Sequence, residues 1–102
     1  MKKIVLFCGA GMSSSLLVLK VRNAVKEAGY DYVVEGYDTT TVVGHSDDAD
    51  VVLVAPQVRF MLNKFRDQIK HCPVETMDMT AYGSMNGAKI LEHARRLMKE
   101  EV

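Results

Sequence analysis

Short, almost wholly apolar runs recur along the chain and predict buried strands. The first covers residues 3–7, and a later one covers residues 50–55 and ends at Pro56. Such runs, without polar alternation, are typical of strands covered on both faces of a parallel sheet. Residues 31–37 are rich in β-forming residues but mixed in polarity, which predicts an edge strand. Residues 74–77 offer a fourth short strand.

Between these runs, apolar residues recur at helical spacing. From Ser14 to Ala28 they lie on one face, and Gly29 is a typical stop signal. A second helix is predicted after Pro56 and is broken by Pro73, and a third ends near Lys99. The apolar positions of the three helices are Leu17, Val21, Ala24, Val25 and Ala28, then Val58, Met61, Leu62, Phe65 and Ile69, then Ala88, Leu91, Ala94, Leu97 and Met98.

The alternation of strands and helices predicts an α/β fold. Right-handed crossovers place helices on both faces of a parallel sheet, and linkage of the second strand back across the first gives a four-stranded sheet of order 2-1-3-4. In such a sheet the ligand crevice opens at the carboxyl ends of strands one and three, where the chain winds in opposite directions. The segment that begins at Cys8 lies there.

The composition of the chain argues against several classes of function. A chain of 102 residues fits a single domain, 1–102, and 13 Lys and Arg against 13 Asp and Glu give no net field to attract nucleic acid. The apolar runs are too short for a membrane span or a signal peptide, so we expect a cytoplasmic protein without membrane insertion. Two cysteines, Cys8 and Cys72, cannot form a disulfide framework and are expected as thiols.

The segment from Cys8 to Ser15 carries the predicted chemistry. Its glycines let backbone N–H groups converge, and the following helix adds unpaired N–H groups and the positive end of its dipole. Ser13 or Ser14 is expected as the N-cap, and its hydroxyl could also donate to an anion. The same field lowers the pKa of a thiol, which makes Cys8 a candidate nucleophile. The predicted phosphate cradle consists of Gly9, Ala10, Gly11, Met12, Ser13, Ser14 and Ser15.

A thiolate beside an oxyanion cradle suits phosphoryl acceptance as S-phosphocysteine. The alternative is a structural cysteine beside a tight strand-to-helix turn. Nucleotide binding is disfavoured, because the segment lacks the order of a P-loop and Ser14 stands where a dinucleotide motif needs its third glycine.

Other polar and aromatic residues follow the third and fourth strands. Pro56, Gln57, Asp78 and Tyr82 are secondary candidates on the crevice side, where Tyr82 could close over the phosphocysteine or belong to an ordinary turn. Cys72 could be a packing thiol, or a resolving thiol in a redox enzyme. His45, His71 and His93 share no ligand spacing with either cysteine, so neither a metal nor another cofactor is expected.

The segment from Ile4 to Val18, with Cys8-Gly-Ala-Gly-Met-Ser-Ser-Ser15 at its centre, resembles the opening of a known family. The family is the IIB components of the bacterial phosphoenolpyruvate-dependent sugar phosphotransferase system, lactose/cellobiose type, with the cellobiose branch nearer. Further similarity lies at Asp50–Gln57, Pro73–Glu75 and Tyr82-Gly83, so it covers essentially the whole chain.

This resemblance implies a cysteine, here Cys8, that is phosphorylated by a histidine of a IIA component. The phosphoryl group then passes to a sugar held by the membrane-embedded IIC permease. The expected sugar is a β-linked disaccharide such as cellobiose. Gly9 stands where some members have Ser, which leaves more of the phosphate binding to backbone donors.

The Cys8 segment also resembles that of low-molecular-weight tyrosine phosphatases, whose core has a similar fold. Those enzymes need an Arg six residues after the cysteine, where this chain has Ser14. Their Asp-Pro acid has no counterpart either, because Met79 follows Asp78. Although these two groups are absent, a Cys-dependent phosphatase or an arsenate-reductase-like enzyme remains the alternative to a relay.

Overall fold

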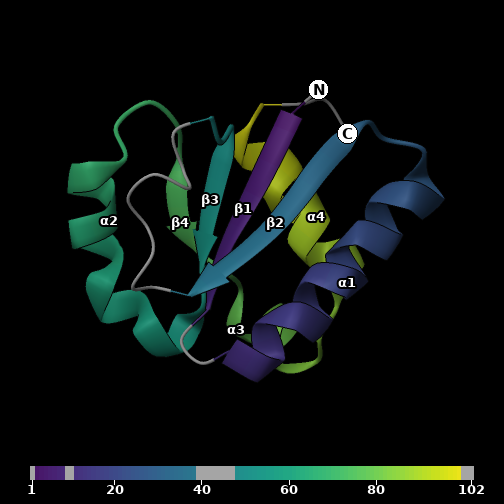
Figure 1. The fold of residues 1–102 in the computed structure, drawn as a ribbon, viewed down its shortest axis with the longest axis horizontal. Coiled ribbons are helices and arrows are strands. Elements are labelled where there is room, and N and C mark those ends of the chain that lie inside the picture. Colours follow the sequence, from purple (N-terminus) through teal and green to yellow (C-terminus); the bar gives the residue numbers. More distant parts are fainter. Residues whose placement is uncertain (1, 9–10, 39–47, 100–102) are drawn as a thin grey trace.

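The computed structural model describes residues 2–8, 11–38 and 48–99. Four strands and four α-helices, with one 3-10 helix, follow one another in these residues (Figure 1). The strands are β1 (Lys2–Cys8), β2 (Tyr32–Asp38), β3 (Val51–Val54) and β4 (Val74–Thr76). The helices are α1 (Gly11–Ala28), the 3-10 helix η2 (Pro56–Met61), α2 (Leu62–Gln68), α3 (Met79–Gly83) and α4 (Gly87–Leu97).

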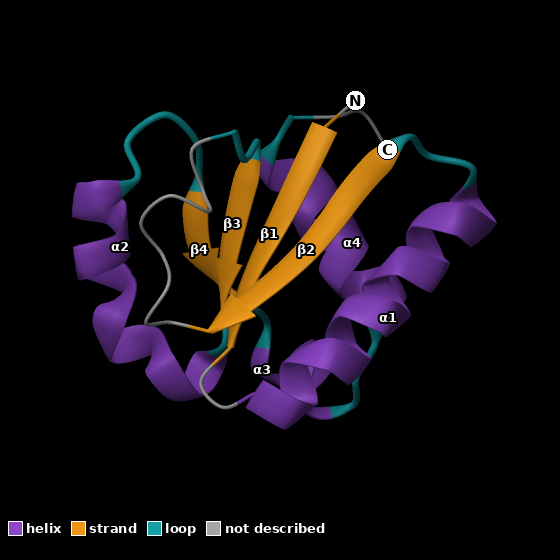
Figure 2. Ribbon diagram, in the orientation of Figure 1, coloured by secondary structure: helices purple, strands orange, loops and turns teal. Residues whose placement is uncertain are grey.

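The strands form one parallel sheet in the order β2-β1-β3-β4, as predicted. The apolar β1 pairs along its whole length with β2, from Lys2 opposite Tyr32 to Cys8 opposite Asp38, and also with β3. β2, the predicted edge strand, lies at one edge of the sheet. The carboxyl ends of the strands point the same way, toward the N-terminus of α1 (Figure 2).

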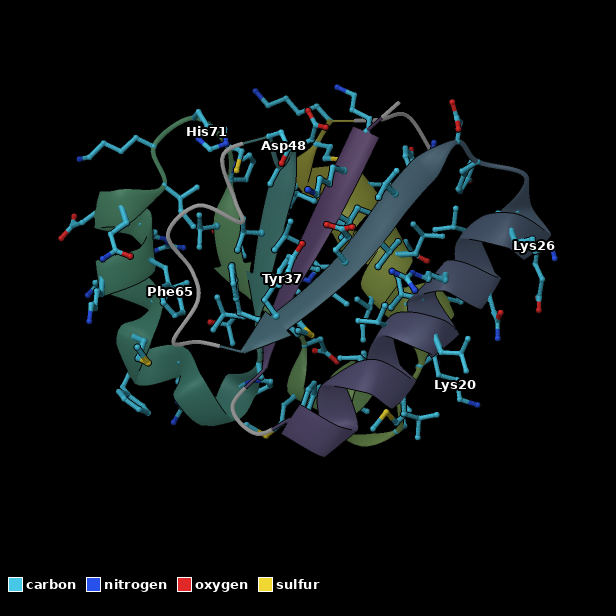
Figure 3. All side chains as sticks on the ribbon, viewed as in Figure 1. Lys20, Lys26, Tyr37, Asp48, Phe65 and His71 are labelled. Atoms are coloured by element: carbon cyan, nitrogen blue, oxygen red, sulfur yellow. The ribbon has the colours of Figure 1, made fainter. Side chains whose placement is uncertain are left out.

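Helices cover both faces of the sheet, which is why the central strands are apolar without alternation. Ile4 and Leu6 of β1 belong to a core that includes residues of α1 and α4. Val5 and Phe7 point the other way, into a second core with Phe65 of α2. Phe65 is almost fully buried, and its ring centroid lies 5.6 Å from that of Phe7 (Figure 3).

The structure corrects three local predictions. α1 begins at Gly11 rather than Ser14, so Ser13 and Ser14 lie inside the helix and neither is its N-cap. The chain after Pro56 first forms a 3-10 helix and becomes α-helical only at Leu62. An ordinary turn at Tyr82, one of the two alternatives for this residue, is not formed, because Tyr82 belongs to the short helix α3.

Asp78 explains why α3 forms. Its backbone is extended, and its carboxylate accepts a hydrogen bond from the backbone N–H of Ala81 at 2.9 Å. This is the arrangement of an N-cap, which satisfies an N–H group that the helix leaves unpaired. The buried Ala81 then anchors α3 on the core beside α1 and α4.

We predict that Asp78→Ala lowers the free energy of unfolding by about 1 kcal/mol, the usual value of an N-cap. Asp78→Asn should keep most of the stability, because an amide oxygen can accept the same hydrogen bond. Asp67→Ala, which removes an exposed carboxylate from α2, is the matched control. Urea unfolding measures all three, and an equal loss for Asp67→Ala and Asp78→Ala would contradict a capping role.

Candidate phosphoryl-binding site

The candidate site lies where the central strand ends and α1 begins. Cys8 is the last residue of β1, and Gly11 is the first residue of α1 (Figure 1). The predictions for Gly9 and Ala10 lie outside the described residues. The same holds for the side chains of Cys8, Met12, Ser13, Ser14, Ser15 and Gln57, of which only the backbone is described.

The earlier start of α1 changes which groups could bind an anion. The first four N–H groups of a helix have no partner within the helix, and they carry the positive end of its dipole. Within α1 these include the N–H groups of residues 11–13, so Gly11 to Ser13 supply helical donors rather than loop donors. An 18-residue helix that follows a cysteine so closely can both bind a phosphoryl group and favour a thiolate.

The ends of the neighbouring strands are brought to the same edge of the sheet. Ala55 donates its N–H to the carbonyl oxygen of Phe7 at 2.8 Å, which places the adjoining Pro56 beside the end of β1. Met77 in turn donates to Val54 at 2.8 Å, so Asp78 follows one strand farther from Cys8. The sheet thus orders these candidates as Cys8, Pro56 and Asp78 across its edge.

Two of the secondary candidates have structural roles. Asp78 caps α3, as described above. Tyr82 is partly buried and packs against the core formed by the sheet with α1 and α4. The closing of Tyr82 over a phosphocysteine stays a prediction.

Exposed apolar side chains at this end of the molecule are a feature that sequence analysis missed. Phe60 of η2 is 79% exposed, Met79 of α3 is 64% exposed and Leu16 of α1 is 47% exposed. Each belongs to an element that begins near the carboxyl edge of the sheet (Figure 2). The sequence pointed to exposure at Phe60, because this aromatic residue lies outside the helical spacing that predicts the core.

Cys72 has the surroundings of a packing thiol. Its side chain is half-buried against the core between the sheet and α2. Burial, with a smaller effect of the Asp50 carboxylate, raises the pKa of the thiol to about 11. A thiol that stays protonated at neutral pH is a poor resolving nucleophile.

The histidines that the structure describes are also far from a ligand arrangement. His71 is exposed, and burial lowers the pKa of His93 on α4. Within residues 2–8, 11–38 and 48–99, no three His, Cys, Asp or Glu side chains are grouped so that they could hold a metal ion.

None of the helices in the described part of the chain is long and apolar enough to cross a membrane.

Comparison with known proteins gives consistent matches over almost the whole chain. Residues 3–93 match the family model of the phosphotransferase system lactose/cellobiose-specific IIB subunit. Two Lactococcus lactis relatives, the galactose-specific and the cellobiose-specific EIIB components, are each 38% identical over 95% of this chain and 96% of their own length. The oligo-beta-mannoside-specific EIIB component of Bacillus subtilis is 39% identical over 96% of this chain and 97% of its own.

Solved structures agree with these matches. The cellobiose-specific IIB component of Borrelia burgdorferi is 35% identical with a TM-score of 0.79, over 96% of this chain and 92% of its own. The lactose-specific IIB domain of Streptococcus pneumoniae has a TM-score of 0.83 at 13% identity, over 94% of this chain and 96% of that one, and so shows the shared fold. The chain therefore belongs to the lactose/cellobiose-specific IIB family and is a phosphotransferase component of a sugar phosphotransferase system.

Proposed function

We propose that Cys8 is the phosphoryl carrier of this IIB component, and that residues Gly9 to Ser15 bind the phosphoryl group. The observation that carries the proposal is the backbone geometry, in which the central strand ends at Cys8 and α1 begins at Gly11. Helical N–H groups beside a cysteine stabilise both its thiolate and the oxygens of a phosphoryl group attached to it.

The relay consists of two transfers. The Cys8 thiolate attacks the phosphorus of a IIA phosphohistidine, so that an S–P bond forms and the N–P bond breaks with its electron pair left on the imidazole nitrogen. In the second transfer a sugar hydroxyl oxygen attacks the same phosphorus. The S–P bond breaks, Cys8 leaves as a thiolate, and the hydroxyl proton passes to a base of the permease. The negative charge that develops on the phosphoryl oxygens is stabilised by the unpaired N–H groups at the start of α1.

The surroundings of the site suit transient protein partners. Leu16, Phe60 and Met79 expose apolar area near the carboxyl edge of the sheet. Exposed apolar side chains near a site are common where proteins bind one another. We propose that the partners are a IIA phosphodonor and a IIC permease with bound sugar, met in the cytoplasm at the inner face of the membrane.

The sugar is recognised in another chain, the permease. The relatives described above are specific for galactose, for cellobiose and for oligo-beta-mannosides. We propose a β-linked disaccharide such as cellobiose, in keeping with the relatives named for cellobiose and β-mannosides.

The first prediction concerns the carrier residue. Incubation with phosphoenolpyruvate, the general phosphotransferase components and a cognate IIA should raise the intact mass by one phosphoryl group. Cys8→Ser should stay unmodified, whereas the matched control Cys72→Ala should be modified like the unaltered protein, because a half-buried thiol with a raised pKa does not act as nucleophile. Intact-mass spectrometry decides, and phosphorylation of Cys8→Ser would place the carrier elsewhere.

A second prediction concerns the binding segment. Gly11→Val places a branched side chain on the first residue of α1, where a phosphoryl group must approach the N–H groups. We expect phosphoryl uptake to be lost while urea unfolding stays cooperative. Gly11→Ala, with a single added methyl group, should be affected less, and uptake by Gly11→Val at the normal rate would exclude this segment as the cradle.

A third prediction separates the relay from a phosphatase. Ser14 lies in the first turn of α1 at the position where phosphatases of similar fold carry an Arg, and Asp78 is occupied as an N-cap. Without these groups hydrolysis should be negligible, and phospho-Cys8 should persist in buffer until a permease with bound sugar is added. Steady-state hydrolysis of an aryl phosphate at ~1 s⁻¹ or faster would favour the phosphatase alternative.

A further inference from the structure

Two glycines allow α1 to lie unusually close to its neighbours. At Gly36 of β2, a Cβ atom would lie 2.3 Å from Cγ2 of Val18 on α1. At Gly87, the first residue of α4, a Cβ atom would lie 2.3 Å from the carbonyl oxygen of Lys20 and 2.8 Å from the backbone nitrogen of Val21. The sheet and α4 thus each contact α1 where any larger residue would overlap with it.

The close contact is specific to these two positions. At Gly83 of α3 an added Cβ would meet nothing within 4 Å, and the same holds for Gly29. Gly29 has a φ of 75°, so its need for glycine comes from the turn after α1. Among the four glycines with described surroundings, only Gly36 and Gly87 set a distance between elements.

Both contacts act on the same helix from different elements. Val18, Lys20 and Val21 lie in the central part of α1, the helix that packs against both β2 and α4. Val18 and Val21 are buried in the core that these elements share. A Cβ added at Gly87 would meet the backbone carbonyl of Lys20, and one added at Gly36 would meet the buried side chain of Val18. Since neither group can easily turn aside, α1 could relieve such an overlap only by moving as a whole.

Cys8, in contrast, is held by the sheet. It ends β1, which pairs with β2 on one side and with β3 on the other and whose residues 4–7 are fully buried. A displacement of α1 would therefore change the distance from the helix N-terminus to Cys8 rather than carry both along. The effect of the helix dipole falls off within one turn, so this distance determines how strongly α1 acts on Cys8.

We infer that Gly36 and Gly87 are positioning residues for phosphoryl transfer, because they allow α1 to seat its N-terminus against the end of β1. The inference rests on the proposed role of Cys8 as carrier. Ordinary van der Waals contact begins at 3.4 Å, so a methyl group at either glycine requires a displacement of about 1 Å. A misplacement of ~1 Å at a reacting centre can cost up to ~100-fold in rate.

The test uses variants of the full chain in a Cys72→Ala background, so that Cys8 is the only thiol. Two quantities are measured for each: the initial rate of phosphorylation by a phosphorylated IIA, and the rate of alkylation by iodoacetamide as a function of pH. Gly36→Ala and Gly87→Ala should slow phosphorylation by about 10- to 100-fold. Both should also shift the alkylation profile to higher pH, because the helix N-terminus no longer stabilises the thiolate.

A size exchange separates positioning from simple loss of stability. Val18→Ala removes the atom that a methyl group at Gly36 would meet, so Gly36→Ala/Val18→Ala should regain most of the phosphorylation rate and the original alkylation profile. Its core still lacks methyl groups, so its urea midpoint should stay low. Gly83→Ala, which fills open space, is the matched control and should change neither quantity.

Should Gly36→Ala fail to fold, Val18→Ile gives a milder form of the same overlap, because it enlarges the side chain that faces Gly36. The inference would be overturned if the folded variants showed the original phosphorylation rate and the original pH profile of alkylation. These variants are Gly87→Ala and Gly36→Ala, with Val18→Ile in place of Gly36→Ala where that variant does not fold. If the unaltered protein accepts no phosphoryl group, the carrier proposal fails. The alkylation profiles then still decide whether the two glycines position α1 relative to Cys8.

Discussion

The pairing of β1 on both of its edges is the constraint on which the rest of the structure depends. β1 pairs with β2 from Lys2 to Cys8 and with β3 from Ile4 to Phe7. Its side chains alternate between two cores, and both must be covered by helices. An apolar strand in this position cannot shift its register by one residue without exchanging the side chains of the two cores. The end of the strand is therefore the most precisely fixed place from which a reactive side chain can extend.

The order of the elements could be predicted because it follows from residues that are buried. Ile4 to Phe7 and Val51 to Ala55 are fully buried, and their unbroken apolar character predicts a parallel sheet covered on both faces. The local start of each helix could not be predicted so well. Ser13 and Ser14 have the character of N-caps, yet α1 begins before them, because capping preference is worth only ~1 kcal/mol and the packing of an entire helix outweighs it.

The candidate site was predictable in its chemistry rather than in its packing. The cysteine, the glycines and the following helix are adjacent in sequence, so local reasoning identifies them. The contacts of Gly36 with Val18 and of Gly87 with Lys20 join residues that are distant in the chain. No periodicity marks them, since a glycine in a strand or at a helix start has several explanations. Phe60 illustrates the same limit, because its exposure depends on the 3-10 conformation that follows Pro56.

Lys3, near the amino end of β1, forms two of the ion pairs among the described residues. The Lys3 ammonium lies 2.9 Å from Asp48 and 3.1 Å from Glu35, and a hydrogen bond from Tyr37 followed by that of Lys3 lowers the pKa of the Glu35 carboxyl. Cys8 lies five residues after Lys3 along the strand, a distance of roughly 16 Å.

That separation is about twice the Debye length of ~8 Å at physiological ionic strength. Lys3 is therefore too far from Cys8 to contact a phosphoryl group bound there. Near Cys8 the field of α1 acts at much shorter range, and it depends on where the helix lies rather than on a side chain that could rotate away. A carrier that must bind a phosphoryl group and then release it benefits from donors of this kind, because they are fixed in place and carry only partial charges. An arginine at position 14 would add a full charge to the bound state and would make the second transfer harder to complete.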